Sequence, residues 1–387
     1  MKVALITCWY KDISMANYSA NLQNASSAKV EWQVVSSHCG CCNRYSGRKN
    51  FLQSVCKFVS FPSYVPSVEK ASSPRALHML LSATSLLLES LRGVAYLTKC
   101  KSDDIIHYQL SASQSFGVSS LFGLLSIPSE KKRVVTVHSI DPLNKFSFYS
   151  RSYRKADRII VHSNEMKRKM ISLSVPEGKI RLVPHGARLP PLLKTSREEI
   201  TFFGSPKSAK GFWTILQSMK ILRDQSREIH LHIYGIYSDS EKNEAIKAAM
   251  NFGVADLLVW GNRISEAEFD RKMQESVFTL AVNTVSVSGS SVVARAMANA
   301  TPIIASNIGG IPEYLGEGGL LVPPSDPQAL ASAMVKLLDD PPLRERLSNT
   351  ARRRAEKFSW DKVAEITINI YEECLRGELN VICKSEI

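Results

Sequence analysis

The 387-residue sequence predicts an α/β protein made of two tandem domains, each a doubly wound parallel sheet. Short apolar runs rich in β-branched residues alternate with stretches of helical spacing, which is the pattern of strands joined by helices. The alternation stops near residue 190 and then starts again. The chain is also longer than the size at which one hydrophobic core usually stops growing, so two domains are expected.

The first series of predicted strands occupies residues 3–7, 30–36, 104–110, 133–139 and 157–163. Helical spacing fills several of the intervals between them, over 17–24 and 74–97. Because strands and helices alternate, we expect a parallel sheet covered on both faces.

A break follows at HGARLPPLLKTSREE, residues 185–199, which contains prolines and charges without a period and is the predicted linker. A second alternating series runs from EITFFGS to GLLVPP and is followed by a wholly helical segment. These observations place the domains at 1–190 and 196–358.

Charge is distributed unevenly between the two halves. The net charge is +13, and residues 1–190 hold 26 Lys and Arg against 11 Asp and Glu, or +15, which leaves −2 for the rest. A basic half predicts an anionic partner, such as a phospholipid surface or a phosphate-bearing acceptor. Nucleic acid is not expected because the basic residues lack interleaved aromatic platforms. A basic surface that serves only solubility is the alternative.

Membrane spans and metal sites are not predicted. The apolar stretch 76–88 is shorter than the roughly 20 residues that a spanning helix needs. The N-terminus MKVALITCWY is typical of a first strand rather than a signal peptide, so we expect a cytoplasmic protein, with peripheral binding at the inner face of the membrane as an option. The cluster Cys39, Cys41 and Cys42 lacks the usual C-x₂₋₄-C spacing of zinc ligands, and reduced thiols are expected there.

Two loops in the second half are suited to binding phosphate. The stretch SVSGSSVVARAMANATPIIAS places Ser288, Gly289, Ser290 and Ser291 before a helix, whose first N–H groups are available to an anion. Ser and Gly also cap helices without any ligand, which is the simpler alternative. The stretch FFGSPKSAKG brings Lys207 and Lys210 to a second strand-to-helix turn. Two such loops in one domain predict a diphosphate site, although loop lysines are often only solvated.

The order of these motifs resembles the retaining, nucleotide-sugar-dependent glycosyltransferases of family 4, which have the two-domain GT-B fold. The resemblance covers nearly the whole chain. It is carried by ISMANYSANL, VVTVHSIDP, ADRIIVHSNEMKRKM, VPEGKIRLVPHGA, FFGSPKSAKG, VWGNRIS, ARAMANATPIIASNIGGIPE and FSWDKVAEITINIYEECL.

Site residues follow from this resemblance. It implies that Lys210 contacts the donor diphosphate, that His138 lies near the transferred sugar, and that residues 288–291 face the sugar and phosphate. It also implies that residues 359–387 cross back to complete the first domain. Further positions that it assigns to the donor side are Ser205, Lys207, Gly309, Gly310 and Glu313, and to the acceptor side Ser14, Met15 and His107.

The sequence departs from the family pattern at the donor site. Val287 and Arg295 stand where the family has glutamates, and Ser205 stands where it has an arginine. Ile13 and Ser14 replace two glycines. Arg295 either binds the diphosphate together with Lys207 and Lys210, or forms an ion pair on a solvated helix face. The donor-only guanidinium cannot accept hydrogen bonds from ribose as a glutamate would.

The predicted function is transfer of a sugar from a nucleotide-sugar to a glycan or lipid-linked acceptor, with retention of configuration, in cell-surface polysaccharide or glycoconjugate biosynthesis. The nucleotide-sugar is a co-substrate, and no metal or other cofactor is expected. The alternative is a catalytically degenerate GT-B subunit that supports an active glycosyltransferase partner.

Overall fold

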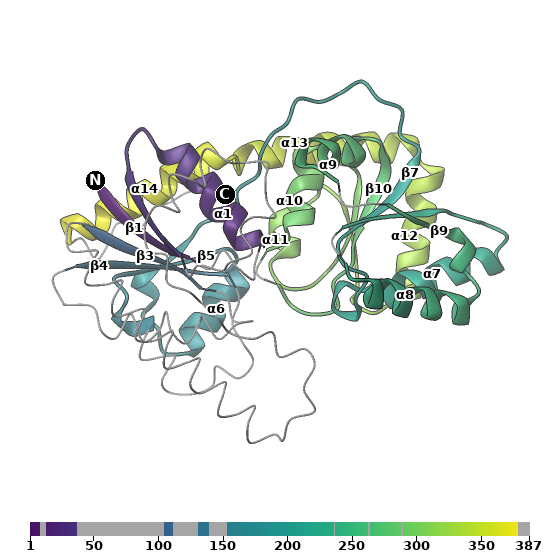
Figure 1. Ribbon diagram of the computed structural model, residues 1–387, viewed down its shortest axis with the longest axis horizontal. Helices are drawn as coiled ribbons and strands as arrows, with labels where there is room; N and C mark the ends of the chain where they lie inside the picture. Colours follow the sequence, from purple (N-terminus) through teal and green to yellow (C-terminus); the bar gives the residue numbers. More distant parts are fainter. Residues whose placement is uncertain are drawn as a thin grey trace, which may run out of the picture. The chain divides into compact units, whose positions relative to one another are not determined.

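The computed structural model describes residues 1–7, 13–36, 104–110, 131–138, 153–235, 237–261, 264–287 and 289–377; for 6–7, 13–17 and 33–36 it describes the backbone. The chain divides into two units (Figure 1). The first contains residues 1–161, 167–183 and 364–387, and the second contains 162–166 and 184–363. The predicted Cys39–Cys42 cluster and the helix at 74–97 lie outside the described residues.

The first unit is built on a six-stranded parallel sheet in the order β2-β1-β3-β4-β5-β6. Its strands are β1 (Lys2–Thr7), β2 (Glu31–Ser36), β3 (Ile105–Leu110), β4 (Lys132–Val137), β5 (Arg158–Val161) and β6 (Ile180–Leu182). Its described helices are α1 (Ile13–Ser26), most of α6 (Asn164–Ser172), the short η3 (Glu177–Lys179) and most of α14 (Trp360–Arg376); residues 164–166 of α6 belong to the second unit. Figure 1 shows α14 along one face of this sheet and α6 on the other.

A buried ion cluster fastens the C-terminal helix α14 to the first unit. Glu373, 3% exposed, accepts hydrogen bonds from Arg158 of β5 at 3.3 Å and from Arg181 of β6 at 2.8 Å. A carboxylate at this depth is tolerated because two guanidinium groups compensate for its lost hydration. The helix therefore completes the first unit although its sequence follows the second, which confirms the predicted crossing back.

The second unit has a six-stranded parallel sheet in the order β12-β11-β10-β7-β8-β9. Its strands are β7 (Glu199–Phe203), β8 (Leu231–Tyr234), β9 (Leu258–Trp260), β10 (Ser276–Ala281), β11 (Ile303–Ser306) and β12 (Leu320–Val322). Its helices are α7 (Phe212–Asp224), α8 (Asp239–Phe252), α9 (Glu266–Gln274), α10 (Ser291–Ala298), α11 (Ile311–Leu315), α12 (Pro327–Asp339) and α13 (Pro341–Lys357), with short η4 (Ser208–Lys210) and η5 (Ala255–Leu257).

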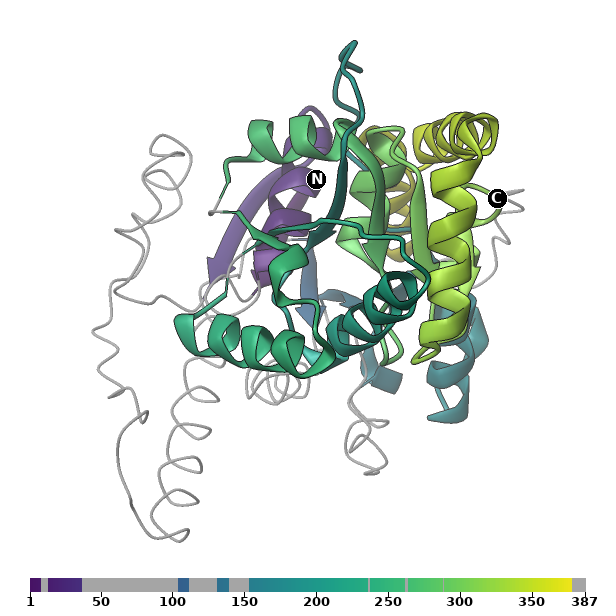
Figure 2. The same cartoon turned by 90° about the vertical axis from the view of Figure 1, so that its right-hand side faces the viewer.

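Helices cover both faces of this second sheet (Figure 2). Alternate strand residues point to opposite faces. Phe202 therefore packs in a core with α7, α8 and α12, while its neighbour Phe203 packs in a second core with α9, α10 and α11. Helix α13 contributes Leu343 to the first core and Ala351 to the second. Burial on both faces explains why the strands read as continuous apolar runs.

Both sheets reverse their direction of winding at one point. The reversal falls between β1 and β3 in the first unit and between β7 and β10 in the second. Ligands of doubly wound sheets bind outside the carboxyl ends of the strands at such a point. The predicted fold class, two doubly wound α/β domains, is confirmed. Among the described residues, no helix has the length and apolar character needed to cross a membrane.

Candidate functional site

The loops that follow β7 and β10 meet at the point where the second sheet reverses. Gly211 ends the turn after β7 with φ +71°, and a Cβ at this position would lie 1.8 Å from the carbonyl oxygen of Val282. Thr284 donates from its backbone N–H to Ala209 O at 3.2 Å and from its hydroxyl to Ser208 O at 3.0 Å. The two loops predicted to bind phosphate are thus joined through their backbones, and only glycine fits at residue 211.

The turn after β11 supports the β10 loop from the other side. Gly309 has φ +65°, and a Cβ there would lie 2.2 Å from Val287 O. Gly310 donates its N–H to the same carbonyl at 2.8 Å. Glu313 accepts hydrogen bonds from the backbone N–H of Asn164 at 2.8 Å and from its Nδ2 at 2.7 Å, within the second unit. Val287 thus supplies no carboxylate, and its main chain is held by the glycine pair.

The loop after β10 ends at the N-terminus of α10, which is exposed to solvent. Ser290 is the N-cap and accepts from the N–H of Val293 at 3.4 Å, and exposed Ser291 is the first helical residue. The N–H groups of the first turn have no partner within the helix, so an anion is favoured there. Gly289 precedes the cap, and Ser288 lies outside the described residues.

His185 borders the α10 loop, and the sequence alone gave it little weight. A Cβ built on Gly289 would lie 3.7 Å from the Cβ of His185. The carbonyl oxygen of His185 accepts a hydrogen bond from the Tyr314 hydroxyl at 2.7 Å, and the Nδ1 of His185 lies 3.1 Å from Gly186 O. Burial lowers the pKa of His185, so the neutral imidazole predominates at neutral pH. Its position just after a strand was the available sequence signal.

A carboxylate holds two of the predicted donor residues. Lys207 Nζ lies 2.6 Å from Glu241 Oε1, and the Ser205 hydroxyl donates to the same oxygen at 3.2 Å. Glu241 also completes a capping box with Ser238 at the start of α8. Hydrogen bonds from Lys207 and then from Ser238 lower the pKa of Glu241 to about 2. Exposed Lys210 ends η4 immediately before Gly211.

Arg295 points from α10 towards α9 rather than standing alone on its helix. Its guanidinium donates to Asp270 Oδ1 at 2.9 Å and to Glu266 Oε2 at 3.0 Å. It also lies 3.5 Å from the centre of the Phe269 ring. Asp270 is 6% exposed and is bonded to Arg188 as well. This is the ion pair foreseen as one alternative for Arg295, although the pair is half-buried between helices rather than solvated.

The site residues predicted in the first unit lie on its sheet and on helix α1. His138 follows the carboxyl end of β4, and its Nε2 lies 2.5 Å from Gln109 Oε1. His107 lies in the middle of β3, fully buried, where burial lowers its pKa to about 3. Ser14 and Met15 belong to the first turn of α1, after Ile13; their side chains lie outside the described residues.

Comparisons with known proteins agree with the fold. Residues 189–354 match the family model described as "Glycosyl transferases group 1", and residues 56–189 match "Glycosyltransferase Family 4". Among solved structures, sucrose-phosphate synthase of Thermosynechococcus elongatus matches with a TM-score of 0.73 and 19% identity, covering 98% of this chain and 100% of that one. Anabaena HepE in complex with UDP matches with a TM-score of 0.70 and 14% identity over 96% and 100%.

Two doubly wound units, with joined loops at the reversal point of the second sheet, define a protein of the GT-B class. The two family matches run together from residue 56 to residue 354. The chain belongs to the family 4-type glycosyltransferases.

Named relatives share only parts of the chain. A D-inositol 3-phosphate glycosyltransferase of Streptomyces bingchenggensis is 33% identical over 34% of this chain and 29% of its own length. The MMP alpha-(1->4)-mannosyltransferase of Mycolicibacterium hassiacum is 31% identical over 43% of this chain and 40% of its own length. The matched segments thus span less than half of these two relatives.

Proposed function

We propose that the protein transfers a sugar from a nucleotide-sugar donor to an acceptor hydroxyl, and that its second unit holds the donor diphosphate. The observation that carries the proposal is the junction of the two loops at the carboxyl ends of β7 and β10, fixed by Gly211 against Val282. The junction brings lysines and the positive end of α10 to one edge of the sheet. No metal ion is needed in this proposal, because main-chain donors and lysines stabilise the departing diphosphate.

The strengths of two ion pairs decide which cations bind the diphosphate. The side chains of Lys207 and Glu241 are 58% and 26% exposed, and a pair of this kind contributes about 0–1 kcal/mol. A diphosphate can therefore replace Glu241 as the partner of Lys207 at small cost. The side chain of Asp270 is only 9% exposed, and taking Arg295 away from it would leave a buried charge short of a partner. We therefore assign the diphosphate to Lys207 and Lys210, while Arg295 stays between α9 and α10.

The proposal also includes the acceptor, the stereochemistry of transfer and the surface to which the protein binds. We propose retention of configuration, a glycan or lipid-linked acceptor, and a role in polysaccharide or glycoconjugate biosynthesis. The charge of +15 on residues 1–190 supports an acceptor or membrane surface that carries phosphate. The inositol phosphate named for one relative belongs in the acceptor screen for the same reason.

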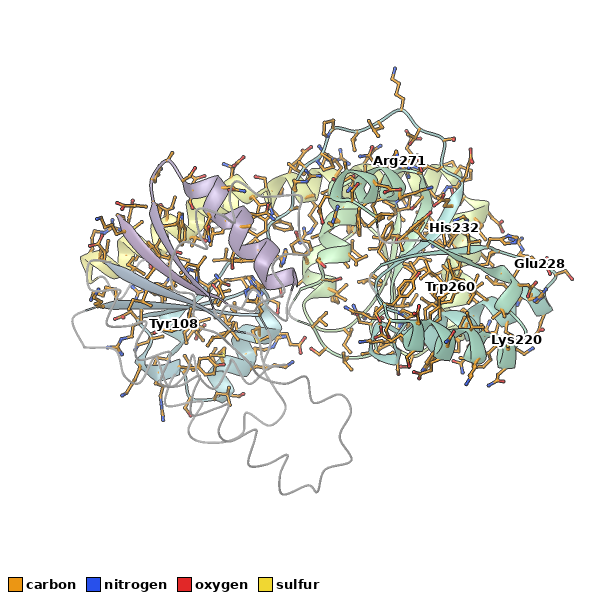
Figure 3. The ribbon with its side chains drawn as sticks, in the orientation of Figure 1. Tyr108, Lys220, Glu228, His232, Trp260 and Arg271 are labelled. Carbon is orange, nitrogen blue, oxygen red and sulfur yellow. The ribbon has the colours of Figure 1, made fainter. Side chains whose placement is uncertain are left out.

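Turnover of a purified donor panel tests this function. UDP-, GDP-, ADP- and CMP-sugars are incubated with the protein and acceptor, and the released nucleotide is measured. Lys210→Ala should lower kcat by about 10²–10³, the usual effect of losing one group that stabilises transition-state charge. Lys220→Ala is the matched control, because Lys220 is an exposed lysine on α7 paired with Asp224 at 2.7 Å (Figure 3). Full turnover by Lys210→Ala would refute the assigned role.

A second candidate is a GT-B subunit that has lost catalysis and supports an active glycosyltransferase. The observation that favours it is the pair of positions Val287 and Arg295, where no carboxylate stands. It predicts no turnover with any donor and a stable complex with a catalytic partner. Co-purification followed by assay of the complex, with and without this chain, distinguishes the two candidates.

A further inference from the structure

A chain of hydrogen-bonded side chains runs through the first unit and ends at His138. Tyr371 of α14 contacts Nδ1 of His107 at 2.6 Å, and the other ring nitrogen of His107 lies 2.7 Å from Thr136 Oγ1. The amide nitrogen of Gln109 lies 3.4 Å from the same ring nitrogen, and its amide oxygen lies 2.5 Å from His138 Nε2. We call this set of five residues the Gln109 chain.

The period of the strands explains why these side chains meet. His107 and Gln109 are two residues apart on β3, so they share one face of the sheet. Thr136 pairs with Gln109 in the register of β3 and β4, and His138 follows two residues later. Because α14 covers this face, Tyr371 reaches the same row. Gln109 and His107 are both 0% exposed, so each polar atom there needs a partner within the protein.

The Gln109 amide is oriented with its oxygen towards His138 and its nitrogen towards His107, and this orientation favours one arrangement of protons. Its carbonyl oxygen can only accept, so the Nε2 of His138 that faces it must carry a hydrogen. Its NH₂ group can only donate, so the facing Nε2 of His107 must be an acceptor. The proton of neutral His107 then sits on Nδ1 and is donated to Tyr371. One uncharged side chain thereby sets the tautomers of both histidines.

We propose that Gln109 is a positioning residue for His138: it holds the imidazole by Nε2–H, so that Nδ1 acts as the hydrogen-bond acceptor at the carboxyl end of β4. This inference rests on the proposed function and on the family resemblance, which implies that His138 lies near the transferred sugar. The ring then accepts a hydrogen bond from a sugar hydroxyl instead of donating one. The ring of Tyr18 in α1, edge-on at 4.8 Å, limits rotation of the imidazole from the side.

The first measurement needs no substrate, and a mutation enters it only to assign signals. Selective ¹⁵N-histidine labelling with long-range ¹H–¹⁵N correlation reports the tautomer of each ring, and the His138 signals are assigned by their loss in His138→Asn. The proposal expects neutral His138 as the Nε2–H tautomer. The Nδ1–H tautomer, or an even mixture of the two, would overturn it.

Two variants separate Gln109 from the rest of the chain. Gln109→Glu puts a carboxylate against Nε2 and should raise the pKa of His138 by about one to three pH units, the usual effect of an adjacent opposite charge. Tyr371→Phe removes only the far end of the Gln109 chain and should leave the pKa and tautomer of His138 unchanged. An unchanged pKa in Gln109→Glu, or an equal shift in Tyr371→Phe, would refute the positioning role.

Catalysis provides a separate readout. If a donor turns over, Gln109→Leu should lower kcat/KM about tenfold, which corresponds to one lost hydrogen bond. In Gln109→Glu the acid limb of the kcat/KM profile should move with the pKa of His138, a change that a purely structural role would not produce. An acid limb that stays in place while the pKa moves would contradict the proposal. Failure of every donor would count against the proposed function, while the NMR result would still decide the tautomer.

Discussion

Replacing Arg295 tests whether this arginine stabilises the fold or binds the nucleotide. Arg295→Met keeps an apolar stem of similar length over Phe269 and removes the guanidinium. The hydrogen bond to Asp270, which is buried, contributes about 1.5–3 kcal/mol, and the cation–π contact about 0.5–2 kcal/mol. The bond to Glu266 contributes little because the Glu266 side chain is 59% exposed.

Asp270 does not become unpaired in this variant, because Arg188 and Asn299 still donate to it. We therefore expect a loss of about 2–4 kcal/mol, somewhat below the 3–5 kcal/mol of a fully broken buried pair. For a domain of this size, 1 kcal/mol corresponds to about 2–4 °C, so the second unit should melt about 5–15 °C lower. The affinity for a nucleoside diphosphate should change less than about threefold, since each tenfold requires about 1.4 kcal/mol.

Differential scanning calorimetry measures the melting temperature, and isothermal titration calorimetry measures the affinity. Arg271→Met is the matched control: Arg271 lies on α9 with a side chain 47% exposed, and its 2.8 Å pair with Glu275 contributes about 0.5 kcal/mol (Figure 3). A variant Arg295→Met that melts like the wild type but binds nucleotide ten times more weakly would refute the assignment, and Arg295 would then be a diphosphate ligand.

Three further substitutions test the packing and charge of the two units. In the unfolded chain His107 takes up a proton near pH 6.5, whereas in the folded chain burial lowers its pKa to about 3. The free energy of unfolding should therefore fall as the pH drops below 6.5, by at most about 1.4 kcal/mol per pH unit. This pH dependence should vanish in His107→Gln and persist in His230→Gln, whose histidine is exposed. Gly211→Ala should destabilise by about 1–3 kcal/mol more than Gly253→Ala, because both glycines have positive φ but only the first meets a backbone oxygen. Glu373→Gln should cost about 3–5 kcal/mol in urea unfolding, because it leaves two guanidinium groups without their buried carboxylate.

Each of these predictions has a result that contradicts it. Equal pH slopes for the two histidine variants would mean that His107 is protonated as easily in the folded chain as in water. Equal costs for the two glycine variants would mean that the loops after β7 and β10 do not touch. The neighbour Glu372, whose side chain is 49% exposed, is the control for Glu373, and equal losses for Glu372→Gln and Glu373→Gln would argue against the buried cluster.

The order of strands and helices could be predicted because it depends on local patterns. Residues 104–110, for example, form one short β-rich run in the sequence and become β3, Ile105–Leu110. Boundaries were less accurate where the local signal was weak: helical spacing indicated 17–24, whereas α1 spans Ile13–Ser26. The conformation of the predicted linker depends on tertiary contacts, which local patterns do not reveal. Leu193 donates its N–H to Gln274 at 2.7 Å, and Ala187 donates its N–H to Phe358 O at 2.8 Å.

The partners within the candidate site could not be predicted, since they come from distant parts of the chain. Arg295 meets Asp270 across two helices, and nothing in ARAMA specifies a carboxylate 25 residues earlier. Tyr371 and His107 are 264 residues apart and meet only because α14 crosses back. Glu241 could have been found as the last residue of the SDSE capping box, but its contact with Lys207 depends on how the loops fold.

Nucleotide binding by the whole chain tests the central claim most directly. Isothermal titration with UDP, GDP, ADP and CMP should give a dissociation constant below about 1 mM for one of them, or −4 kcal/mol. Lys210→Ala should weaken this binding about tenfold or more, and Lys220→Ala should leave it unchanged, because only the first lysine stands at the joined loops. Absence of binding to every nucleotide at millimolar concentration, or equal affinity in Lys210→Ala, would contradict a diphosphate site in the second unit.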